Sequence, residues 1–149
     1  MQDQTSKTLV PAEESAEVVR RLILWLNTYP DKPVRRIEYE ALPTNKSMCV
    51  SSIQGAYKTR QYILGGYEAQ YQFKVIYRLQ PDDSDSNLAA DEALDALGSW
   101  AESAIPGPDL GAGVQFRKLR RDSSSALFST YEDGSRDHQI LMTMIYEVI

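Results

Sequence analysis

The chain has 149 residues, with 16 basic and 21 acidic side chains and a formal net charge of −5. This length suits one domain with an ordinary hydrophobic core. The negative balance disfavours DNA or an anionic membrane as the main partner. A single cysteine, Cys49, excludes an internal disulfide, and no run of eighteen apolar residues is present to cross a membrane. With no secretory leader visible, we expect cytoplasmic synthesis.

Two amphipathic helices are predicted within one domain over residues 12–149, after a polar, flexible tail over residues 1–11. The first should run from Ala12 to Tyr29, because Pro30 disfavours helical geometry in the preceding residue. Its opening turns carry acids that complement the helix dipole, namely Glu13, Glu14 and Glu17. The second should begin near Ser86 or Asn87 and end by Ser103. Their apolar stripes contain Val19, Leu22, Leu26 and Tyr29, and Ala90, Leu94, Leu97, Ala101 and Ala104.

The rest of the domain has the period-two pattern and turn chemistry of β-strands. The expected strands span residues 37–41, 48–53, 57–64, 67–77, 114–119, 127–131 and 138–149. Gly65-Gly66 and the segment 132–135 supply hairpin turns. The order of helix, strands, helix and strands predicts an α+β fold. We expect a mixed, mainly antiparallel sheet with both helices packed on one face.

Few residues in this sequence are suited to catalysis or metal binding. His138 beside a hairpin turn is expected to be a partly exposed strand-end histidine, and Cys49 a small buried side chain. Asp82, Asp83 and Asp85 resemble half a calcium loop, but the central glycine and distal glutamate are missing. No phosphate-binding loop is recognisable. We therefore predict a protein that is not an enzyme and needs no metal or cofactor.

Two other features have competing interpretations. Arg117, Lys118, Arg120 and Arg121 form a basic cluster that is either a solvated strand edge or a contact for DNA or an acidic partner. Tyrosines gather around the glycine hairpin, and tyrosine suits a surface that becomes buried on association, although core packing also uses it. The candidate interface residues are Tyr57, Tyr62, Tyr67 and Tyr71.

An overall resemblance covers most of the chain from about residue 15 onward. It is carried by SIQGAY (52–57), QYILGGY (61–67) and YQF (71–73). Further support comes from WLNTYP (25–30), LGSW (97–100) and DHQILM (137–142). In these segments the sequence resembles minor capsid or tail-terminator proteins encoded by phages and prophages of Gram-positive bacteria.

This resemblance implies a subunit that closes into a ring with its own copies, commonly a hexamer. Such a ring caps the tail tube and meets the head–tail connector, with DNA passing non-specifically through its lumen. The protein would then be found in the host cytoplasm during assembly and in the virion afterwards, away from membranes. The alternatives are a head-completion or connector protein, a monomeric adaptor of a mobile element and, less favoured, a small hydrolase.

Overall fold

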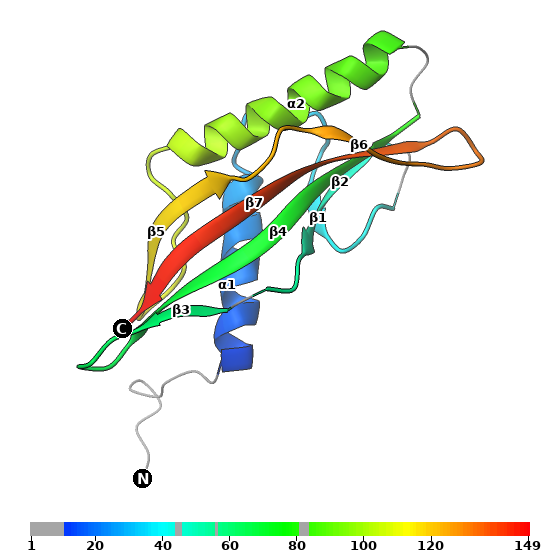
Figure 1. Ribbon diagram of the computed structural model, residues 1–149. Helices are drawn as coiled ribbons and strands as arrows, with labels where there is room; N and C mark the ends of the chain where they lie inside the picture. The colour runs from blue at the N-terminus through cyan, green and yellow to red at the C-terminus, as the bar shows by residue number, and fades with distance from the viewer. Residues whose placement is uncertain (1–10, 44–45, 56, 81–83) are drawn as a thin grey trace.

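A computed structural model describes residues 11–43, 46–55, 57–80 and 84–149 (Figure 1). Residues 1–10 of the tail expected over 1–11, and Asp82 and Asp83 of the acidic loop, lie outside these ranges, while Pro11 is the first residue of the first helix. The described residues form two helices and seven strands. In chain order they are α1 (Pro11–Leu26), β1 (Ile37–Tyr39), β2 (Ser47–Ser52), β3 (Lys58–Gln61), β4 (Tyr67–Leu79), α2 (Ser84–Ser103), β5 (Val114–Arg121), β6 (Ala126–Thr130) and β7 (Arg136–Val148).

All seven strands belong to one sheet with the order β1-β2-β4-β7-β5, while β3 pairs with β4 and β6 pairs with β7. The long strands β4 and β7 pair antiparallel along their whole length, from Tyr67 opposite Val148 to Leu79 opposite Arg136. Only β1 and β2 pair in parallel among the described strands. The predicted α+β fold with a mixed, mainly antiparallel sheet is therefore confirmed.

The core lies between one face of the sheet and the two helices (Figure 1). Alternate residues of β4 and β7 point to this face because side chains along a strand alternate between its two sides. The helices meet where Trp25 stacks on Trp100, with ring centroids 4.6 Å apart. The largest fully buried side chains are Leu22, Leu26, Ile37, Met48, Phe73, Leu94, Leu97, Leu110, Ile140, Met142, Met144 and Tyr146.

The first helix ends three residues earlier than predicted, at Leu26 instead of Tyr29. Asn27 donates its side-chain amide to the Ile23 carbonyl, at 2.9 Å. The Thr28 hydroxyl donates to the Trp25 carbonyl, at 2.6 Å. In a continuing helix the Trp25 carbonyl would accept the Tyr29 amide, but that amide donates to the Leu26 carbonyl instead. Asn27 also accepts the Ile37 amide at 2.7 Å, which fixes the helix end to β1.

Further predicted boundaries differ from the structure, among them those of the strands expected over 57–64 and 37–41 and of the second helix. The strand expected over 57–64 is limited to β3, and the residues from Tyr62 to Gly66 form a turn in which Tyr62 N–H donates to the Gly66 carbonyl. The strand expected over 37–41 stops at Tyr39, because Glu40 adopts a positive φ of 50°. The second helix begins at Ser84, two residues before the predicted cap.

Candidate interaction surfaces

A buried carboxylate joins the first helix to the sheet below the tyrosine-rich hairpin. Glu14 of α1 is 2% exposed. Its carboxylate accepts hydrogen bonds from Tyr57 (2.5 Å), from Tyr146 of β7 (2.8 Å) and from Tyr67 of β4. The Tyr57 and Tyr67 hydroxyls also lie 3.0 Å apart. This cluster connects α1, β4, β7 and the segment leading into β3.

Burial raises the pKa of Tyr57, Tyr67 and Tyr146 above the ordinary value of 10, and the hydrogen bonds to Glu14 raise it further. Burial also raises the pKa of Tyr71, to about 12. A folded-state pKa above the unfolded value means that the unfolded chain releases its protons first as the pH rises. Stability from these tyrosines is therefore complete below pH 10 and is lost above it.

This gives a testable alkaline transition. We expect phenolate absorbance to rise in two steps, first from the more exposed tyrosines and then, above about pH 11, together with loss of circular dichroism. Tyr146→Phe should remove one phenol from the second step. A single titration near the ordinary tyrosine pKa, with the fold intact throughout, would contradict the expectation.

The hydroxyls of the four candidate interface tyrosines bond within the subunit. Tyr57 and Tyr67 bind Glu14, and the Tyr62 hydroxyl donates to Glu147. Tyr71 stacks on Phe73, with centroids 5.3 Å apart, and its hydroxyl lies 2.5 Å from Ser52 Oγ. Their rings remain half-buried.

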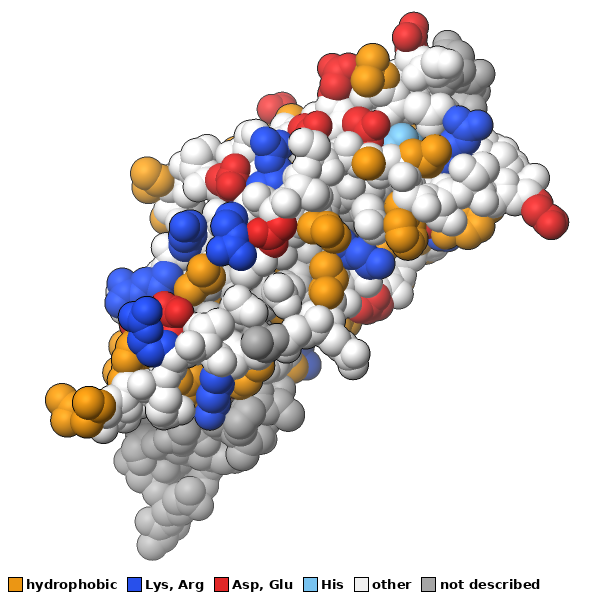
Figure 2. Space-filling model, in the orientation of Figure 1, with side chains coloured by type: hydrophobic (Ala, Val, Ile, Leu, Met, Phe, Trp, Pro, Cys, Tyr) orange, Lys and Arg blue, Asp and Glu red, His pale blue; other side chains and the backbone are white. Residues whose placement is uncertain are grey.

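The apolar tip of this hairpin is instead made by two residues that the sequence placed in a strand. Ile63 and Leu64 are both 100% exposed. They sit at the free end of the β3–β4 hairpin, where Figure 2 shows hydrophobic side chains at an extremity of the molecule. Gly65 and Gly66, at φ of 98° and 80°, close the turn behind them. Two fully solvated aliphatic side chains on a projecting turn are typical of a contact surface.

The basic cluster of β5 is divided between several internal contacts. Arg117 pairs with Glu147, and Arg120 with Asp122 at 2.7 Å. Arg121 crosses to the helix side of the sheet, where its guanidinium donates to the Asp95 carbonyl at 3.2 Å. Lys118 is exposed and forms no ion pair with the residues that the structure describes. The four side chains therefore do not act as one continuous cationic patch.

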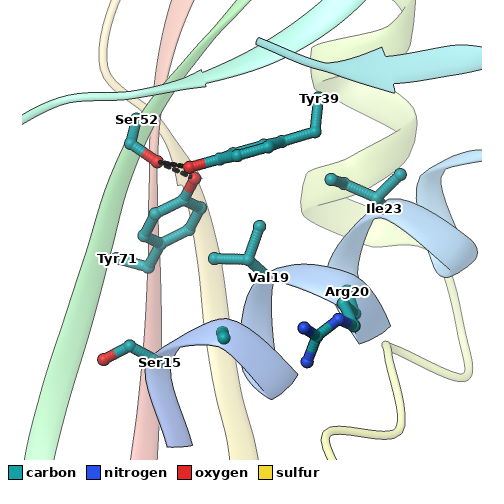
Figure 3. Close-up of a pocket in the computed structure, with 8 residues that line it drawn as sticks. Ser15, Val19, Arg20, Ile23, Tyr39, Ser52 and Tyr71 are labelled. Carbon is teal, nitrogen blue, oxygen red and sulfur yellow. Dashed lines mark hydrogen bonds between the residues drawn. The ribbon is translucent and has the colours of Figure 1, made fainter. Parts of the chain in front are cut away.

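An apolar pocket of about 360 Å³ lies between α1 and the edge of the sheet (Figure 3). Val19 and Ile23 of α1 face the rings of Tyr39 and Tyr71 across it. Ser52 joins the two phenols, since its hydroxyl lies 3.0 Å from the Tyr39 hydroxyl and 2.5 Å from that of Tyr71. These polar ends are mutually bonded, so the pocket offers mainly apolar surface to a partner.

A wider groove of about 840 Å³ adjoins this pocket and shares Arg20, Ile23 and Tyr39 with it. The groove runs beside β1, the strand at one end of the sheet order. Its lining carries four cationic side chains and one carboxylate. They are Arg20, Lys32, Arg35, Arg36 and Glu38.

The histidine and cysteine have structural positions. His138 is 1% exposed, so the expectation of a partly exposed side chain was wrong. It lies opposite Tyr77 in the β4–β7 register, on the face that the helices cover. Asp91 and Asn87 of α2 contact its two ring nitrogens, at 2.8 Å and 3.1 Å. Cys49 is buried, as predicted.

The described residues contain no group of three or more metal-binding side chains. No helix in those parts of the chain has the length and apolar character needed to span a bilayer.

Comparison with known proteins adds one finding about the fold. No protein-family model and no curated protein matches the sequence. Among solved structures, a chain from a structure titled "Virion of native gene transfer agent (GTA) particle" superposes with a TM-score of 0.60 at 11% identity. The match covers 87% of this chain and 97% of that chain. The protein therefore has the fold of a chain found in a gene transfer agent virion structure.

Proposed function

We propose that this protein is a structural subunit of a phage-like virion and that it acts as a tail terminator. The supporting observation is the fold likeness to a chain from a gene transfer agent virion structure, which extends over 97% of that chain. The resemblance of segments 52–73 and 137–142 to tail-terminator proteins supports the same proposal. The protein works by assembly and catalyses no reaction.

The proposed assembly is a ring, commonly a hexamer, that caps the tail tube and joins it to the head. A cyclic homo-oligomer needs two different surfaces on each subunit, because each copy meets its neighbours through heterologous contacts. The apolar hairpin tip at one end of the molecule and the pocket beside β1 supply two distinct surfaces. The proposed contact for passing DNA is Lys118, the side chain of the β5 basic cluster that forms no ion pair within the described residues.

The Tyr57–Tyr71 hairpin is proposed as one subunit contact, with Ile63 and Leu64 as the side chains that become buried. Replacing both with serine should leave the monomer as stable as before, since both are fully exposed. Loss of their burial should weaken self-association about 100-fold or more, given about 1.5–3 kcal/mol for each buried aliphatic side chain. Analytical ultracentrifugation over a concentration series measures this.

Two comparisons make that experiment decisive. Ile105→Ser removes another fully solvated aliphatic group, 95% exposed, and should not change the mass. Tyr62→Ser with Tyr67→Ser should also weaken association, but it removes the bonds to Glu147 and Glu14 and therefore lowers stability too. Unchanged association of the Ile63→Ser, Leu64→Ser variant would remove the hairpin from the interface.

The function itself is tested by mass and by microscopy. The purified protein should form a closed ring at high concentration and should bind to the end of isolated tail tubes in electron micrographs. Binding to portal or connector complexes alone would favour a head-completion protein, and a monomer at every concentration would favour an adaptor. Turnover of a small molecule by such a monomer would favour the hydrolase alternative.

A further inference from the structure

The groove beside β1 has an unbalanced positive charge. Arg20 and Arg36 each have a long contact to a carboxylate, 3.7 Å to Glu17 and 3.7 Å to Glu38. Lys32 and Arg35 have no ion-pair partner among residues 11–43, 46–55, 57–80 and 84–149. Leu24, 67% exposed, adds an apolar side chain to the same lining. A partner for this groove should present carboxylates around a small apolar group.

Helix α2 has that chemistry. It contains five carboxylates and no lysine or arginine. They are Asp85, Asp91, Glu92, Asp95 and Glu102, of which Asp91, Asp95 and Glu102 also accept hydrogen bonds within the subunit. On its outer surface Leu88, Glu92, Ser99 and Glu102 are exposed and follow each other at helical spacing, so they share one face. Figure 2 shows acidic side chains along this helix.

The basic groove and the acidic face of α2 lie on opposite sides of the layer that the two helices form. The helices face each other through Trp25 and Trp100. The groove is on the far side of α1, beside the terminal strand β1. The acidic flank of α2 is on the other side, where Asp95 accepts the Ser125 backbone amide of the β5–β6 connection at 2.8 Å. One subunit therefore cannot bring them together, but two adjacent subunits can.

We propose that α2 of one subunit docks into the basic groove beside β1 of the next. The inference rests on the proposed ring, and it adds a second heterologous contact to the one proposed for the hairpin. Leu88 meets Leu24, while Glu92, one helical turn further along the same face, lies against Lys32 and Arg35. Complementary charge of this kind fixes which surfaces pair and in what register. Identical surfaces repel, because groove against groove and helix against helix bring like charges together.

Charge exchange tests this pairing. One variant carries Lys32→Glu and Arg35→Glu, which reverses the groove, and a second carries Glu92→Lys and Ser99→Lys, which reverses the helix face. Each alone should raise the dissociation constant about tenfold or more. An equimolar mixture should recover ring mass, because the groove of each variant then matches the helix of the other. Subunits of the two kinds would alternate around a ring with an even number of copies.

Further variants and a salt titration separate the effect of charge pairing on assembly from damage to the fold. A chain with all four substitutions should assemble like the wild type, and circular dichroism should show all variants folded. Lys118→Glu with Arg120→Glu changes the charge equally on β5 and should not change ring mass. Raising the salt from about 0.05 M to about 1 M shortens the Debye length to about 3 Å and should weaken wild-type assembly.

The outcomes also distinguish this inference from the function on which it rests. Wild-type rings whose mass no charge variant alters would overturn the α2–groove contact and leave the tail-terminator proposal standing. Failure of the mixture and of the combined chain to recover rings would overturn it as well. A wild-type protein that stays monomeric and ignores tail tubes would instead remove the proposed function.

Discussion

Replacing Glu14 with alanine should destabilise the folded monomer by about 3–5 kcal/mol, because the three phenolic hydroxyls lose a shared buried acceptor. The carboxylate is 2% exposed and accepts from Tyr57, Tyr67 and Tyr146. A buried donor without an acceptor keeps the full penalty of its lost hydration. Urea denaturation followed by tryptophan fluorescence measures the change.

A neighbouring acid on the same helix provides the control for this experiment. Glu17→Ala removes two surface ion pairs, to Arg20 at 3.7 Å and Arg21 at 3.4 Å, and should cost about 1 kcal/mol or less. Glu14→Gln keeps one acceptor oxygen and should fall between the two. If Glu14→Ala and Glu17→Ala lower the free energy of unfolding equally, the tyrosine cluster contributes no more to stability than a surface ion pair.

The position of Glu14 also connects stability to assembly. Tyr67 begins β4 directly after the hairpin turn, and Tyr57 precedes β3, so both arms of the hairpin are fixed to α1 through one carboxylate. A hairpin fixed in this way presents Ile63 and Leu64 in a defined place. Ordering a contact segment before association reduces the entropy that association must overcome. Glu14→Gln should therefore weaken ring formation more than its effect on stability alone explains.

The sequence predicted the helices and long strands because their apolar periodicity is regular. Alternation in segment 67–77 identified β4, and the three- and four-residue steps identified both helices. It placed the hairpin turn at Gly65-Gly66 but missed that the turn begins at Tyr62, since Tyr62, Ile63 and Leu64 have the composition of a strand. The pairing of β3 with β4 fixes where the turn begins, because Gln61 pairs with Tyr67 and a bulge lies between Lys58 and Arg60.

Two buried polar residues were missed although a signal was present. His138 falls on the same alternation as Ile140 and Met142, which places it on the helix-covered face. Glu14 lies four residues before Val18 in the buried stripe of α1, so its spacing indicates burial, whereas the sequence interpretation considered only its favourable place at the positive end of the helix dipole. The basic groove had no such signal, because its residues come from α1, the following connection and β1 and meet only in three dimensions.

The second large effect on stability is expected at the other end of the sheet, at a partly buried ion pair between adjacent strands. Arg78 of β4 and Asp137 of β7 are paired in register. The Arg78 Nε and Nη2 atoms donate to the two Asp137 carboxylate oxygens at 2.8 Å and 2.9 Å. The Tyr131 hydroxyl donates to the same carboxylate at 2.7 Å. Hydrogen bonding to Asp137 raises the pKa of Arg78.

Arg78→Ala should destabilise the protein by about 3–5 kcal/mol, because it leaves the Asp137 side chain, 4% exposed, charged and without its cation. Arg36→Ala, which breaks an exposed contact of 3.7 Å to Glu38, should cost about 1 kcal/mol or less. The combined variant Arg78→Met, Asp137→Leu should recover most of the lost stability, since it removes the carboxylate together with its cation and leaves no unpaired charge. If the combined variant is as unstable as Arg78→Ala, the penalty comes from packing between β4 and β7 and not from the isolated carboxylate.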